Sequence, residues 1–181
     1  ASQRAKSVVK QILTFSRQSD QKRKPLKVDP IVKESIKLLK ASLPSTIQIQ
    51  LYIDPAAGII EADATEIHQI IMNLSTNAYH AMSKTGGLLD VKVENADLNA
   101  EMAEHFEIRT GNYLSISVAD TGHGMAPEVL ERIFEPYFTT KEKDRGTGMG
   151  LAVVHGILKG YGGAIAVDSK PGKGTVFTVY I

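Results

Sequence analysis

One carboxylate stands where a predicted strand ends. Residues 113–119 alternate apolar and polar side chains, a pattern typical of a half-buried strand, and Asp120 follows them directly. Gly122 and Gly124, in the stretch that ends at Met125, let the backbone turn sharply and approach a ligand closely. A carboxylate in this position can accept hydrogen bonds from a flat heterocycle. Glycine turns after strands are common without any ligand, so this segment alone does not identify a site.

A second group of polar residues recurs along a predicted helix. The pattern Asp63-Ala-Thr-Glu66 has the form of a capping box and opens a helix that we expect to end near Met82. At about 100° per residue, one stripe of this helix contains Glu66, Gln69, Asn73, Asn77 and His80. An asparagine oxygen is a hard ligand that suits Mg²⁺, and its NH₂ group can donate to phosphate. A solvated helix face is the alternative interpretation of the same stripe.

The third group is a glycine-rich run at a predicted junction between loop and helix. It consists of Gly146, Thr147, Gly148, Met149, Gly150 and Leu151. Exposed backbone N–H groups and the helix dipole make an anion site at such a junction. The spacing does not match the dinucleotide pattern G-x-G-x-x-G, and the Lys-Ser/Thr pair of the Walker loop is missing. Lys141 and Arg145, just upstream, could add positive charge near phosphates or simply keep the loop hydrated.

The Asp120 stretch, the polar helix stripe and the glycine-rich run belong to a chain in which the sequence predicts both helices and strands. We expect helices over residues 29–43, 63–82, 127–134 and 151–160, and strands over 47–53, 87–93, 113–120, 164–168 and 175–181. Asp29 is the expected N-cap of the first of these helices, and residues 96–112 are expected to form an extended loop with a helical turn. The order shows no steady βαβ alternation, which favours an α+β fold with one sheet covered by helices.

The loop over residues 135–150 is longer than the usual connection of about 4–6 residues, which indicates a lid or binding loop. At the other end of the chain, residues 1–20 have an apolar stripe at helical spacing, typical of an amphipathic helix that packs on the domain or on a partner. Residues 21–28 are basic, polar and proline-containing, as in a linker.

Composition excludes several classes of protein. The 181 residues include no cysteine, so disulfides, thiolate catalysis and cysteine-based metal centres are excluded for this chain. The formal net charge is +1, which gives no general excess of Lys and Arg for binding nucleic acid. No apolar run reaches the roughly 18–20 residues needed to span a bilayer. No signal-peptide pattern opens the chain. Because the chain begins at Ala1 rather than Met and ends on a strand-like run, we expect a fragment of something longer.

Together the segments resemble the ATP-binding catalytic domain of the two-component sensor histidine kinases. Residues 73–78 (NLSTNA) resemble the N box, 120–124 (DTGHG) the G1 box and 134–138 (FEPYF) the F box. Residues 146–151 (GTGMGL) are similar to the G2 box, and 172–175 (GKGT) to the last glycine box. Order and spacing match over residues 27–181. Residues 1–20 are similar to the end of the second dimerisation helix that precedes this domain in the family.

The resemblance implies the Bergerat fold, a two-layer α/β sandwich, over residues 29–181, with ATP and Mg²⁺ as cofactors. By position, Asp120 would accept from the adenine amino group, Asn77 would ligate Mg²⁺ and Asn73 would assist. Gly122, Gly124, Met125, Lys141, Thr175 and the glycine run 146–151 would line the nucleotide site. Its expected partners are the chain's own dimerisation and phosphoacceptor domain and a response regulator. The parent would be a homodimer, membrane-anchored or not, with this domain in the cytoplasm.

Three departures from the patterns of the relatives affect the expected reaction. Gyrase-like relatives carry a catalytic glutamate one turn before the metal-binding asparagine, whereas this chain has Asn73, so water activation for ATP hydrolysis is not supported. His80 stands where many relatives carry Lys or Arg. None of the five histidines precedes Glu or Asp, as the family's phosphoacceptor does. We therefore expect phosphate transfer to a histidine outside this fragment. A nucleotide-binding regulatory module without phosphotransfer is the alternative.

Overall fold

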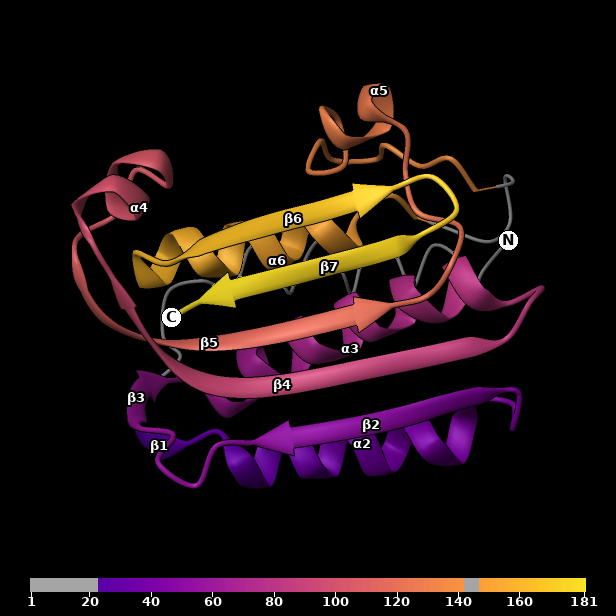
Figure 1. Cartoon of the computed structure of the whole chain (residues 1–181). Helices are drawn as coiled ribbons and strands as arrows, with labels where there is room; N and C mark the ends of the chain where they lie inside the picture. Colours follow the sequence, from indigo (N-terminus) through magenta and orange to yellow (C-terminus); the bar gives the residue numbers. More distant parts are fainter. Residues whose placement is uncertain (1–22, 142–146) are drawn as a thin grey trace, which may run out of the picture.

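The computed structural model describes residues 23–141 and 147–181, and the predicted helix over residues 1–20 lies outside them. A five-stranded mixed sheet in the order β2-β4-β5-β7-β6 forms one layer (Figure 1). Its strands are β2 (Ile47–Ile53), β4 (Gly87–Leu98), β5 (Gly111–Asp120), β6 (Ala164–Lys170) and β7 (Gly174–Tyr180). β2 and β4 run parallel, and the other neighbouring pairs are antiparallel.

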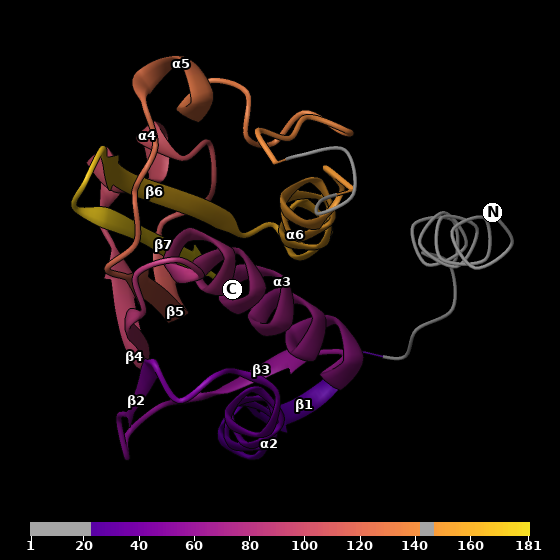
Figure 2. The same cartoon turned by 90° about the vertical axis from the view of Figure 1, so that its right-hand side faces the viewer.

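Three helices form the second layer on a single face of this sheet. They are α2 (Asp29–Ser42), α3 (Ala64–Met82) and α6 (Gly150–Tyr161), which lie on the same side of the strands when the molecule is viewed edge-on (Figure 2). The expected α+β, two-layer sandwich is therefore confirmed. The short helices α4 (Ala100–His105) and α5 (Pro127–Leu130) lie at opposite ends of the sheet (Figure 1).

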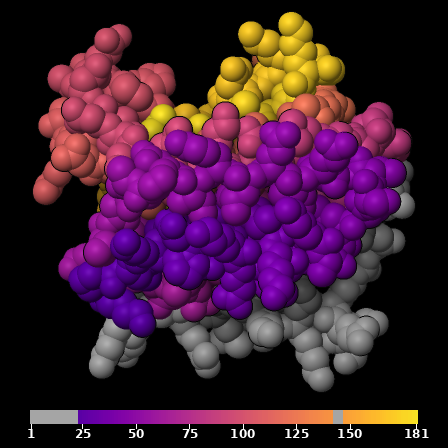
Figure 3. Space-filling model, turned by 60° about the horizontal axis from the view of Figure 1, so that its bottom comes forward, coloured from indigo at the N-terminus to yellow at the C-terminus, as the bar shows by residue number. Residues whose placement is uncertain are grey.

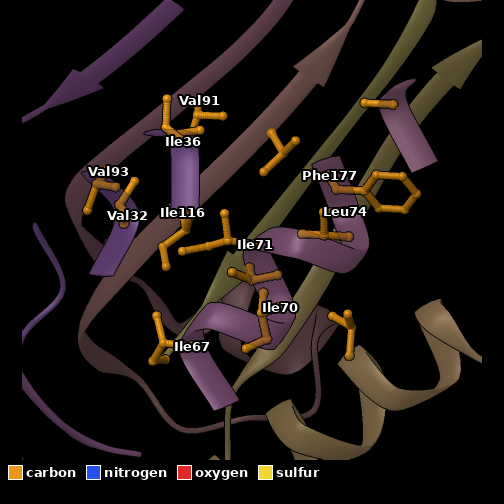
Figure 4. Close-up of a cluster of buried hydrophobic side chains, with 14 of the residues drawn as sticks. Val32, Ile36, Ile67, Ile70, Ile71, Leu74, Val91, Val93, Ile116 and Phe177 are labelled. Carbon is orange, nitrogen blue, oxygen red and sulfur yellow. The ribbon is translucent and has the colours of Figure 1, made fainter. Parts of the chain in front are cut away.

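The core lies between the two layers and fixes where α3 sits. Along α3, Ile67, Ile70, Ile71 and Leu74 are fully buried at helical spacing. Facing them are Val91 and Val93 of β4, Ile116 of β5, Phe177 of β7, and Val32 and Ile36 of α2 (Figure 4). Burial of one apolar stripe leaves the neighbouring polar stripe of α3 turned away from the sheet. The two predicted asparagines lie on that stripe.

A small second sheet extends the domain on the side of α2. β1 (Lys24–Lys27) pairs antiparallel with β3 (Ile59–Ala62), with Lys24 opposite Ala62. The region of α2 and these early strands, coloured indigo to purple, covers the face shown in Figure 3. Residues 24–27 were expected to be part of a linker, and instead they form a strand. Residue-by-residue periodicity misses such four-residue strands because their pairing partner is more than thirty residues away.

Several other helix and strand boundaries in the structure differ from the predicted ones. Helix α5 ends at Leu130, because residues 131–134 form tighter turns, with the Arg132 amide donating to the carbonyl of Val129. Asp29 lies in the first turn of α2, whose N-cap residue is Val28. Residues 96–112, expected as a loop, contain the end of β4, helix α4 and the start of β5. In the described part of the chain, no helix is both long enough and apolar enough to cross a membrane.

Candidate functional site

Asp120 is the last residue of β5 and one of few buried polar side chains in the described structure. Its side chain is 8% exposed, and its Oδ1 accepts a hydrogen bond from the Gly122 amide at 2.8 Å. Burial raises the pKa of the Asp120 carboxyl, although hydrogen bonds from the backbone of Gly122 and Thr175 oppose this shift. The carboxylate thus faces a site poor in water, where a matching donor would be favourable.

The glycines after Asp120 allow the loop to press against its neighbours. A Cβ on Gly122 would lie 2.6 Å from the Cβ of Ala81 on α3, and one on Gly124 would lie 2.0 Å from the carbonyl oxygen of Lys170. Gly124 also has φ +64°, a conformation that glycine adopts without strain. The His123 amide donates to the Ala81 carbonyl at 3.3 Å. The loop is therefore fixed to α3 one turn beyond Asn77.

A small hydroxyl network holds the far side of this loop, and the sequence analysis missed one of its members. Ser169 Oγ accepts from the Met125 amide at 2.9 Å and lies 2.9 Å from the hydroxyl of Thr175. Thr175 is buried and pairs with Asp120 across the β5–β7 ladder. Met125 and Thr175, both predicted as site residues, thus lie on the same side of the Asp120 loop. Ser169 carries no sequence signal of its own.

Asn73 connects α3 to the glycine-rich run at the start of α6. Its Nδ2 donates to the carbonyl oxygen of Gly150 at 3.2 Å. A Cβ on Gly150 would meet the Asn73 amide only at ordinary contact distances of 3.7 Å and more. The amide therefore holds the first residue of α6 against the middle of α3. An amide cannot remove a proton from water as a carboxylate does, so the lack of water activation at Asn73 stays a prediction.

Asn77, one turn further along α3, faces a cation. The Lys141 ammonium donates to Asn77 Oδ1 at 3.0 Å, across 64 residues of sequence. Burial lowers the pKa of Lys141. The structure therefore brings together two residues that were predicted separately, one as a metal ligand and one as a charge near phosphates.

The described part of the glycine-rich run is held through Tyr137, which the sequence analysis did not select. The Tyr137 amide donates to the Gly148 carbonyl at 3.0 Å, and both residues have positive φ, +67° each. A Cβ on Gly148 would lie 2.4 Å from the Tyr137 carbonyl carbon, so only glycine fits there. Positive φ is rare for tyrosine, and the sequence carries no sign of it. Residues 135–141 and 147–149 contain neither helix nor strand, as expected for that loop.

The remaining predicted residues have less direct contacts with this cluster. The Met149 amide donates to Thr147 Oγ1 at 3.4 Å, and Met149 itself is buried. Leu151 packs at the edge of the core. The ring of His80 lies in the last full turn of α3, 5.2 Å from the ring of Tyr79. Gly146 and Arg145 lie outside the described residues.

The start of α6, Lys141 and the loop after Asp120 thus all contact the part of α3 between Asn73 and Ala81, which defines a candidate nucleotide site in an α/β sandwich. Residues 62–181 match the family model described as histidine kinase-, DNA gyrase B-, and HSP90-like ATPase. The chain belongs to this family. Among its members it is a catalytic, ATP-binding domain of the sensor histidine kinase type.

Similar proteins support this assignment. The chain is 37% identical to the sensor kinase CckA of Brucella abortus (strain 2308), over 98% of this chain and 19% of that protein. It is 34% identical to the sensor histidine kinase ZraS of Klebsiella oxytoca, over 98% of this chain and 35% of that protein. The chain therefore spans about a fifth to a third of the length of these relatives.

Two solved structures share the fold closely. The chain matches full-length ShkA in complex with AMPPNP with a TM-score of 0.75 and 26% identity, over 96% of this chain and 35% of that one. It matches the nucleotide-free catalytic domain of histidine kinase ThkA with a TM-score of 0.68 and 28% identity, over 88% and 94% of the two chains.

Proposed function

We propose that this domain binds Mg²⁺ and ATP between α3, the Asp120 loop and the start of α6, and donates the γ-phosphate to a histidine on another segment. The observation that carries the proposal is the convergence of three groups with matched chemistry. A buried carboxylate can accept from adenine, an amide oxygen already faces a cation, and a glycine-rich run begins a helix. Together they provide for the base, the metal and the phosphates.

Asn77 fits the role of metal ligand because its oxygen is already oriented toward positive charge. The Lys141 ammonium donates to this oxygen at 3.0 Å, which supports the proposal that the oxygen is accessible to a cation. No three His, Asp or Glu side chains within residues 23–141 and 147–181 lie close enough to bind a metal by themselves. Mg²⁺ would therefore take most of its ligands from phosphate and water, as is usual for this ion, and would neutralise the charge on the phosphates.

The metal role of Asn77 can be tested by removing its oxygen. We expect Asn77→Ala to weaken ATP binding mainly through the part that depends on Mg²⁺, so that titration with Mg²⁺ improves affinity less than in the wild-type chain. Fluorescent-nucleotide competition with and without Mg²⁺ measures this, and Thr76→Ala, an exposed neighbour, is the matched control. An unchanged Mg²⁺ response in Asn77→Ala would exclude the assignment.

In the proposed transfer, a nitrogen of the acceptor imidazole attacks the γ-phosphorus while the bond from phosphorus to the ADP oxygen breaks. The chain's own part is positioning and charge stabilisation. Asp120 would hold the base and Asn77 would hold the metal, which would neutralise charge on the phosphates. Asn73 holds α6 so that its N-terminal N–H groups face the phosphates. Lys141 is close enough to Asn77 to add a positive charge beside the same phosphates.

The phosphotransfer itself is tested with γ-labelled ATP. Because none of the five histidines has the acceptor pattern, we expect the 181-residue chain to remain unlabelled by itself. Adding a helix bundle that carries an acceptor histidine followed by Glu or Asp should produce acid-labile label on the bundle. If ATP binds and no label moves, the domain is the regulatory nucleotide-binding module instead. Stoichiometric label on this chain would show that the acceptor was misassigned.

The same proposal includes partners beyond this chain. The acceptor histidine would belong to the parent's own dimerisation domain, in a homodimer, and its phosphate would pass to the receiver domain of a response regulator. The support is the similarity to sensor kinases that are three to five times longer than the matched segment. We place the domain in the cytoplasm, with the parent chain membrane-anchored or free.

A further inference from the structure

Arg23, the first described residue, contacts the last turn of α6. Its guanidinium lies over the ring of Tyr161, 4.3 Å from the centroid, and its Nη2 donates to the carbonyl oxygen of Gly160 at 2.6 Å. A carbonyl at the C-terminal end of a helix has no partner within the helix and carries the negative end of the dipole. A guanidinium suits both this carbonyl and the aromatic face.

The same tyrosine also contacts the first turn of α3. Its hydroxyl donates to Glu66 Oε2 at 2.5 Å and accepts from the Asp63 amide at 2.9 Å. Burial and the Glu66 carboxylate raise the pKa of Tyr161 to about 12, so the hydroxyl keeps its proton and remains a donor at neutral pH. Arg23, Tyr161, Glu66 and Asp63 thus form one cluster, which we name the Arg23 clasp.

The clasp lies at the opposite end of α6 from the nucleotide site. Helix α6 packs beside α3 and runs against its direction, because Tyr161 meets the start of α3 while Gly150 meets Asn73 in its middle. Besides the packing of Val154, Ile157 and Leu158 in the core, polar contacts join the two helices at two points, the clasp and the Asn73–Gly150 hydrogen bond. Over twelve residues a helix is stiff, so fixing its last turn restricts its first.

We propose that Arg23 is a positioning residue for nucleotide binding: it fixes the last turn of α6 to α3 and thereby holds the glycine-rich start of α6 at the phosphates. Arg23 also stands immediately before β1, where the segment 1–22 joins the domain. This inference rests on the proposed nucleotide site, and its test separates the two.

The first measurement is hydrogen exchange on the nucleotide-free 181-residue chain. Arg23→Ala should speed exchange of amides along α6, as far as the Val153 amide, which donates to the Met149 carbonyl at 2.9 Å in the first turn. Strand β2, which lies at the far edge of the sheet, should be unaffected. Lys24→Ala is the matched control, since it removes an exposed positive charge at the next residue. Faster exchange in both variants, or no change at Val153 in Arg23→Ala, would overturn the inference.

The second measurement is ATP affinity at a temperature where every variant is fully folded. Arg23→Ala should weaken ATP binding by about two- to fivefold, the size expected for an exposed cation–aromatic contact, and Lys24→Ala should not. In an Asn73→Ala background the effect of Arg23→Ala should be larger, because the clasp is then the remaining one of the two polar restraints on α6. A lower melting temperature with unchanged affinity would mean that Arg23 only stabilises the fold.

The two measurements also separate this inference from the proposed function. If the wild-type chain bound no ATP, the proposed function would fail, and exchange at Val153 would still decide whether Arg23 positions α6. If the wild-type chain bound ATP and the Arg23→Ala effect were no larger in the Asn73→Ala background, the route through α6 would be wrong while the nucleotide site stood.

Discussion

The buried carboxylate of Asp120, which is proposed to bind the base, lowers the stability of the folded domain when it is ionised. Because burial raises the pKa of its carboxyl above the ordinary value, the folded domain binds this proton more tightly than the unfolded chain does. Below the ordinary pKa both states are protonated and the group has no effect. As the pH rises through the ordinary value and then through the raised one, the unfolded chain ionises first and stability is lost. The full loss is present once the pH lies above the raised pKa.

Replacement by asparagine should therefore stabilise the nucleotide-free domain. Asp120→Asn keeps an oxygen for the Gly122 amide but no longer places a charge in the buried position. We expect a higher free energy of unfolding than wild type at pH 7, with the gain shrinking as the pH falls toward 4. Urea denaturation across this range measures it, with Asp168→Asn, an exposed aspartate on β6, as control. A gain that does not vary with pH would mean that ionisation of Asp120 is not the cause.

The same substitution should alter the choice of base. An ionised carboxylate only accepts hydrogen bonds, so it matches the amino group of adenine and opposes the carbonyl of guanine. An unsatisfied buried group costs about 1–3 kcal/mol, which corresponds to a preference for ATP over GTP of roughly five- to a hundredfold, and more when the group is charged. In Asp120→Asn the side-chain amide can turn so that its NH₂ group donates to the guanine carbonyl. The difference between the affinities for ATP and GTP should therefore become smaller. Competition of ATP and GTP against a fluorescent nucleotide tests this, and an unchanged ratio would show that Asp120 does not contact the base.

Among the elements, α3 has one internal conflict between burial and polarity. Ser75 lies between the two site asparagines but on the opposite, fully buried face, and in the described structure no group bonds its hydroxyl. Ser75→Ala removes this group and raises helix propensity, so the domain should gain about 1–2 kcal/mol in unfolding free energy. ATP affinity should be unchanged, because the stripe with Asn73 and Asn77 is untouched. A loss of stability would indicate an unseen partner of the hydroxyl.

Helices and strands with long periodic patterns could be predicted from the sequence. Short strands that pair with a segment far away in the sequence could not. Helix α3 was placed within a residue at each end because its apolar stripe, its Asp63 cap and its length all agree. Asp63 does cap the helix, but Glu66 bonds Tyr161 instead of completing the capping box. Strands β1 and β3 were missed because four residues carry little periodicity and their pairing depends on the rest of the fold.

In the candidate site too, the residue types could be predicted from local sequence patterns, whereas the contacts between distant segments could not. Asp120, Asn73 and Asn77 could be selected from their residue types and spacing. The contacts that join them, Lys141 with Asn77 and Asn73 with Gly150, cross 64 and 77 residues of sequence. Such contacts follow from how α3 and α6 pack on the sheet, which no local pattern specifies. The Arg23 clasp spans still more of the chain, 137 residues.

Because the site lies between elements that are far apart in sequence, nucleotide binding should stabilise the domain as a unit. Free ATP with Mg²⁺ at a hundred times its dissociation constant should add about 2.7 kcal/mol to the free energy of unfolding. For a chain of this size that corresponds to a rise in melting temperature of roughly 5–10 °C. GTP at the same concentration should give a smaller rise, since Asp120 opposes guanine.

Thermal unfolding with a titration of each nucleotide measures these shifts, and two variants separate the contributions of base and metal. Asp120→Asn should reduce the difference between ATP and GTP, and Asn77→Ala should reduce the part of the shift that needs Mg²⁺. Equal shifts with ATP, GTP and magnesium alone would mean that the gain comes from general ionic effects. In that case the convergence of Asp120, Asn77 and the start of α6 would not be a nucleotide site.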